Sequence, residues 1–171
     1  MPLLAAQPVN QRLTIGIYRV VGQNDEAVTS PTYATGLRTA LEQIYKSAFW
    51  MSKARFAQAR QRLNETAFLA HGWDTYGAES PNDLARTLAD KILNVLETAS
   101  LPPTRLTPSV EGGIAMSFVE GSNRAVIEIY NTGAIAAATY SDEGEPAVWE
   151  LDSETDALQG TIAQIRVHLA T

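Results

Sequence analysis

The hydrophobic positions between about Gly36 and Ala70 follow a helical period. An early set keeps helical spacing at Leu37, Leu41, Ile44, Tyr45 and Ala48. Beyond it, one apolar residue recurs every seven positions, at Phe49, Phe56, Leu63 and Ala70. This spacing predicts either one long helix or two helices bent near residues 49–51, and the pattern leaves both interpretations open.

A second helix is predicted from Ser80, with Ser80 as its N-cap and Pro81 in its first turn. The apolar stripe of this helix is Leu84, Leu88, Ile92, Val95, Leu96 and Ala99. It must stop before Pro102 and Pro103, because proline lacks the amide hydrogen that a helix interior requires.

After the prolines the apolar period falls to two, which is typical of strands with one buried face. The alternating segments lie at residues 114–119, 125–130, 134–140 and 147–151. Their short connections predict an antiparallel meander, and a closing helix follows from Ser153. A further strand is predicted near the start of the chain, at residues 13–21.

The predicted fold class is α+β: N-terminal helices, one of them long, a four-stranded antiparallel meander, and a C-terminal helix packed on the sheet. We expect a single domain over residues 1–171, with a helical part at about 30–100 and the sheet and last helix at about 104–171. The sequence has no targeting signal and no apolar stretch of about 20 residues, so a cytoplasmic protein without membrane contact is expected.

The net charge of −6 is a local property. Residues 141–171 hold seven acids and one base, which accounts for the whole of that charge. Residues 43–64, in contrast, hold five bases and no acid. The chain therefore has a basic middle and an acidic end, an arrangement that favours association with another charged surface.

The residues that usually carry catalysis or bind metals are scarce. The chain has no cysteine and two histidines, and it lacks the phosphate-loop, nucleophile-elbow and zinc-protease motifs. We therefore expect no catalytic residues, no metal and no cofactor. The alternative is an enzyme whose noncontiguous site uses Asp74, Tyr76 and Glu128, and a deep pocket lined by these three residues would support it.

Three segments carry a resemblance to known sequences: Trp73–Ala78, which reads W-D-T-Y-G-A, then Pro108–Ile114 and Ile127–Ile129. The chain resembles a loosely defined group of small bacterial proteins of unassigned role, with a W-D-x-Y-G-A turn, a helix, and a P-x-x-D-G-x-I segment entering a sheet. The sequence departs from that pattern at Glu111, where aspartate is usual, and at Phe118, where tryptophan is common. The resemblance implies a fold pattern and a bacterial or phage setting.

These observations favour a non-catalytic protein-interaction module: an accessory subunit, an inhibitor, or an antitoxin-like neutraliser of a larger protein partner. The predicted partner-binding residues are Lys46, Phe49, Trp50, Lys53, Phe56, Arg60, Asp142, Glu143 and Glu145. The alternative is a nucleic-acid-binding accessory protein that uses the basic aromatic helix at residues 43–64. A homo-oligomer formed through the stripe of Phe49, Phe56 and Leu63 is a further alternative, since that face is longer than a small sheet can cover.

Overall fold

The computed structural model describes residues 31–142 and 144–171. The chain divides into two compact units, residues 1–38 and residues 39–171. The described part of the first unit is the beginning of helix α1 (Pro31–Glu65). All packing described below lies within the second unit. The strand predicted at residues 13–21 lies outside the described residues.

The second unit is built on an antiparallel sheet in which each strand pairs with the next in sequence. Its strands are β1 (Arg105–Ser109), β2 (Gly113–Glu120), β3 (Asn123–Tyr130), β4 (Ile135–Tyr140) and β5 (Ala147–Leu151). The meander is therefore confirmed, but it has five strands, and the prediction of four was wrong. The missed strand, β1, is short and contains Pro108, which is tolerated because β1 is an edge strand.

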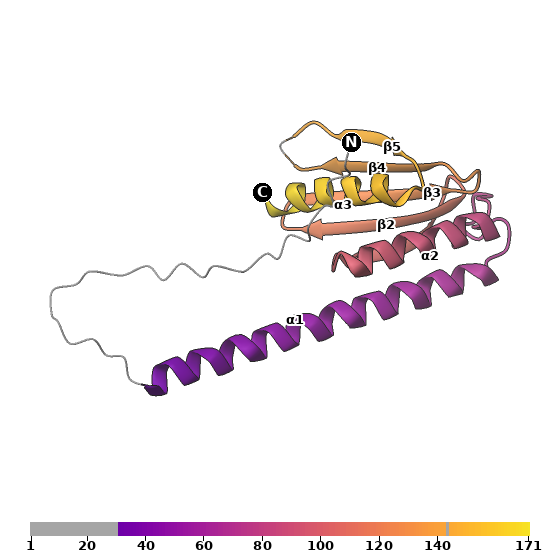
Figure 1. Ribbon diagram of the computed structural model, residues 1–171. Coiled ribbons are helices and arrows are strands. Elements are labelled where there is room, and N and C mark those ends of the chain that lie inside the picture. The colour runs from indigo at the N-terminus through magenta and orange to yellow at the C-terminus, as the bar shows by residue number, and fades with distance from the viewer. Residues whose placement is uncertain (1–30, 143) are drawn as a thin grey trace, which may run out of the picture. The chain divides into compact units, whose positions relative to one another are not determined.

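One face of the sheet forms the core. Along β2 and β3 every second side chain is fully buried, as Ile114, Met116, Ile127 and Ile129 illustrate. Helices α2 (Asp83–Thr98) and α3 (Thr155–Ala170) pack against this face and against each other (Figure 1). The α+β class, with the last helix packed on the sheet, is confirmed.

Helix α1 is one continuous helix, which settles the choice between one helix and two. It runs from Pro31 to Glu65 and is followed by a short 3-10 helix, η1 (Thr66–Phe68). Its buried apolar residues are Phe56, Ala59 and Leu63, on one side of its C-terminal half. At 1.5 Å per residue its 35 residues span about 52 Å, whereas the 16 residues of α2 span about 24 Å.

Helix α2 begins two residues later than predicted. Its N-cap is Asn82, whose side-chain oxygen accepts the amide hydrogen of Ala85 at 2.9 Å, so the prediction of Ser80 as N-cap was wrong. Asn131, in the β3–β4 turn, determines this start. Its side chain accepts the Asn82 amide hydrogen at 2.8 Å and donates to the Ser80 carbonyl at 3.0 Å. Local sequence favoured Ser80, but a contact from the sheet selects Asn82.

The glycines supply a matched test of this packing. A Cβ on Gly113 would lie 2.0 Å from the Ile129 carbonyl oxygen, and its φ of +138° is one that side-chain-bearing residues avoid. We expect Gly113→Ala to lower the free energy of unfolding by at least about 2 kcal/mol. Gly160, inside α3, has open space around its Cβ position, so Gly160→Ala is expected to raise that free energy by up to about 1 kcal/mol.

Urea unfolding followed by circular dichroism measures both changes. A Gly113→Ala protein as stable as wild type would contradict the close approach of β2 and β3 at this position.

Candidate functional site: the exposed half of helix α1

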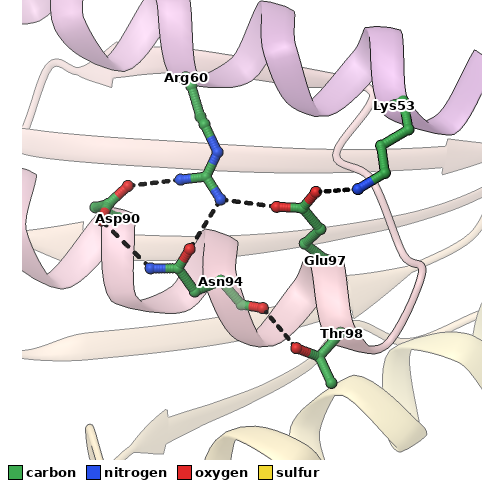
Figure 2. A network of polar contacts seen from close by, with 6 residues as sticks. All are labelled: Lys53, Arg60, Asp90, Asn94, Glu97 and Thr98. Atoms are coloured by element: carbon green, nitrogen blue, oxygen red, sulfur yellow. Dashed lines mark hydrogen bonds and ion pairs between the residues drawn. The ribbon is translucent and has the colours of Figure 1, made fainter.

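The C-terminal half of α1 is held against α2 by a cluster of charged side chains (Figure 2). Lys53 Nζ lies 2.7 Å from Glu97 Oε1, and Arg60 Nη2 lies 2.9 Å from Glu97 Oε2. Arg60 also donates to Asp90 at 2.7 Å and to Asn94 at 2.8 Å. Because the later residue on α1 contacts the earlier residues on α2, the two helices run antiparallel.

In this cluster, acids of α2 neutralise the positive charges of Lys53 and Arg60. The hydrogen bond from Lys53, followed by that from Arg60, lowers the pKa of the Glu97 carboxyl below its ordinary value of 4.5. Both basic residues therefore have an acidic partner within their own chain, on α2 and not in the acidic end of the sequence.

Three residues of the predicted partner surface thus serve the fold. Lys53 and Arg60 are committed to the ion pairs with α2. Phe56, only 3% exposed, belongs to the hydrophobic core, so its side chain cannot contact a partner while the fold is intact. Lys46, Phe49 and Trp50 are exposed and remain available.

Helix α2 ends too early to cover the rest of α1. Its last helical residue is Thr98, immediately after the Glu97 that pairs with Lys53. The chain then turns away through Ser100, which has a φ of +53°, and reaches Pro102. The residues of α1 that precede Lys53 consequently extend beyond the end of α2.

Large apolar side chains are exposed on this uncovered part of α1. In the second unit five of them are Leu41 (46% exposed), Ile44 (66%), Tyr45 (75%), Phe49 (49%) and Met51 (60%), and we call these five residues the exposed stripe. At 3.6 residues per turn, spacings of three, four and seven spread them over a little less than half of the helix circumference, with Phe49 and Met51 at its two edges. Trp50 is also exposed, at 68%, but it projects from another side and meets the Phe49 ring edge-on at a centroid distance of 5.6 Å.

The acidic residues of the predicted surface and helix α1 belong to opposite edges of the sheet. Asp142 and Glu145 are exposed in the connection between β4 and β5, and Glu143 lies outside the described residues. Strand β5 is one edge of the sheet, whereas α1 flanks the other edge, at β1. The structure therefore does not bring the acidic turn and the basic helix together.

Of the three residues of the alternative enzyme site, Asp74 and Tyr76 share one turn of the loop before α2, and Glu128 lies on β3. Asp74 accepts amide hydrogens from Ala78 at 2.9 Å and from Tyr76 at 3.0 Å, and these bonds, the one from Ala78 foremost, lower its pKa. Its carboxylate thus organises the loop between η1 and α2. Glu128 lies on β3, where it accepts hydrogen bonds from Ser109 and Tyr130. Burial, and secondarily the Glu128 charge, raises the pKa of the Tyr130 phenol.

Two hollows in the described part of the chain flank α1. The first, of about 600 Å³, lies between α1 and β1, with Arg55, Arg62 and Arg105 among its lining residues. The second, of about 620 Å³, is a shallow groove between the end of α1 and α2. Neither is lined by Asp74, Tyr76 or Glu128, so the pocket that would support the enzyme alternative is not found at these hollows.

Two further features bear on the kind of site. Among the described residues, no three histidine or acidic side chains gather in a way that would hold a metal ion. Within the same part of the chain, no helix combines the length and apolar character that crossing a bilayer requires.

Sequence reasoning did not assign Leu41, Ile44 or Tyr45 to the partner surface, because their spacing is the same as that of core residues. The feature that identifies them is the length of α1 compared with the lengths of the elements that could cover it. Strands of five to eight residues span about 17–26 Å, so neither they nor α2 can cover a helix of about 52 Å.

The ion-pair cluster predicts a pH-dependent stability. We expect Arg60→Gln to lower Tm by a few degrees at pH 7, because Asp90 and Glu97 lose their shared cation. Since the pKa of Glu97 is lowered in the folded state, its contribution is complete above pH 4.5 and is lost as the pH falls through the lowered value. The Tm difference from wild type should therefore shrink at strongly acidic pH.

Thermal melts at several pH values measure this effect. Arg55→Gln is the control, since Arg55 makes no ion pair within the described residues and its loss should change Tm little at any pH. Equal Tm losses for the two variants would contradict the role of the cluster.

In comparisons with known proteins, no family model, no curated protein and no solved structure matches the chain.

Proposed function

We propose that this protein is a non-catalytic protein-interaction module that binds another protein through the exposed stripe of α1. The observation that carries the proposal is the exposure of five large apolar side chains on one side of a single helix. Contiguous apolar surface of this kind is costly to leave in water and usually marks an interaction site. An amphipathic helix that lies against an apolar surface of a partner is a common form of protein recognition.

The charges around the stripe support a protein partner over a nucleic acid. Lys53 and Arg60 are neutralised by acids of α2 and Arg62 pairs with Glu65, which leaves Lys46 and Arg55, nine residues apart, as the bases of residues 43–64 without an ion pair among the described residues. Nucleic-acid binding needs several uncompensated cations along one surface. The neutralised cluster does not supply them, so we do not adopt the nucleic-acid alternative.

The proposal includes the roles that the sequence favoured: an accessory subunit, an inhibitor, or an antitoxin-like neutraliser. In each of these roles a small module acts by occupying a surface of its partner. The exposed stripe provides the apolar centre of such a contact, while Lys46 contributes to its polar margin.

Capture from cells that naturally contain the protein tests the proposal. We expect tagged wild-type protein to retain a defined protein partner, and Ile44→Glu to lose at least about tenfold of it, because a carboxylate would be buried without a counter-charge. Quantitative mass spectrometry of the captured proteins gives the ratio.

Val167→Glu is the matched control, because Val167 is 68% exposed on α3 and Ile44 is 66% exposed on α1. Both variants should keep the wild-type circular dichroism spectrum. If Ile44→Glu and Val167→Glu captured the same proteins in equal amounts, the stripe would not be the binding surface.

A further inference from the structure

We infer that the partner of the exposed stripe is a second copy of this chain, and that the two copies of α1 pair antiparallel about a two-fold axis near Ile44. This inference rests on the proposed function, because it names the partner of the same surface. It follows from three properties of α1: the continuity of its apolar side, the area exposed there, and the placement of its charges.

The exposed stripe continues a surface on which a helix already packs. Along the C-terminal half of α1, the buried residues Phe56, Ala59 and Leu63 lie on nearly the same side of the helix as the stripe. Beside them α2 runs antiparallel to α1 as far as Thr98, joined to it by the ion pairs of Lys53 and Arg60. An antiparallel helix placed beyond the end of α2 would continue the line of this packing along α1.

The exposed area fits a dimer of modest strength. With about 200 Å² of accessible surface for each large side chain, the five residues of the stripe leave on the order of 600 Å² exposed. Two copies together would bury at most about 1,200 Å², the lower end of the range for specific protein interfaces. A concentration-dependent dimer is therefore expected.

The charges of α1 select the antiparallel orientation. In a parallel pair, Lys46 would lie against Lys46 and Glu42 against Glu42. In an antiparallel pair centred near Ile44, Lys46 of one copy lies opposite Glu42 of the other, so opposite charges meet on both sides of the axis. Such an arrangement uses the same surface on both copies and closes at two chains.

Sedimentation velocity across a concentration series tests the pairing in the full-length protein. Wild type and Val167→Glu should shift from one chain to two as concentration rises, whereas Ile44→Glu should remain a single chain at every concentration. The same circular dichroism spectrum in all three proteins shows that the change is in assembly and not in folding.

The absence of cysteine from the chain allows a test of orientation. Under mild oxidation, Ile44→Cys should form a disulfide between two copies, because positions near the two-fold axis bring equivalent residues within the reach of a disulfide. A mixture of Leu41→Cys and Ala48→Cys should form the mixed disulfide in preference to either homodisulfide. Val167→Cys should form none above the level expected from random collision.

Three results would overturn the inference. A single chain at all concentrations, with the new thiol of the Ile44→Cys variant accessible to a thiol reagent, would show that no second copy binds. A single chain in which that thiol is protected from the reagent would show that another part of the same chain covers the stripe. Homodisulfides of Leu41→Cys and Ala48→Cys in preference to the mixed one would show a parallel pair.

The failures of the two proposals are distinguishable. If the protein stays a single chain but still captures a different protein in a manner that depends on Ile44, the self-pairing is wrong and the proposed function stands. If capture and sedimentation are both unaffected by Ile44→Glu, both proposals fail.

Discussion

The antiparallel packing of α1 on α2 is the constraint on which the rest of the structure depends. It attaches a helix of 35 residues to one of 16, so only part of α1 can be covered. The apolar residues of the covered part, Phe56 and Leu63, each contribute about 1.5–3 kcal/mol through burial. The part of α1 that lies beyond Thr98 has the same apolar character without that burial.

The polar contacts between α1 and α2 determine the register of the two helices more than they stabilise their packing. Ion pairs near the surface are screened by water, and they stabilise a protein little compared with buried apolar area. Their main effect is on geometry. Arg60 contacts Asp90, Asn94 and Glu97 at the same time, which requires one particular position of α1 along α2. The register in turn determines which residues of α1 lie beyond the end of α2.

Periodicity was sufficient to predict most of the fold. The helical period over residues 36–70 and the alternation after Ile114 identified the long helix, the meander and the α+β class. The errors arose where tertiary contacts override local signals. Asn131 moves the start of α2 from Ser80 to Asn82, and the sheet edge accommodates Pro108 in a strand that its sequence alone disfavours.

The predicted partner surface was less reliable than the fold, for a physical reason. Charge and aromatic content are visible in a sequence, but whether a side chain is already paired or buried depends on what packs against it. Lys53, Phe56 and Arg60 fit the expected composition of an interface, yet α2 and the core use them. Ile44 and Tyr45 look like core residues, yet no described element of the second unit buries them.

The division between charged and apolar surface also bears on how the protein associates. Because acids of α2 neutralise two bases of α1, the uncompensated charge of the described chain lies largely in the β4–β5 turn and around α3, away from the stripe. Long-range charge affects the rate and orientation of encounter and is screened by salt, whereas apolar contact depends little on salt. If the stripe is the contact surface that we propose, the two surfaces act on different steps: the acidic end on the rate and orientation of encounter, and the stripe on how long the complex lasts.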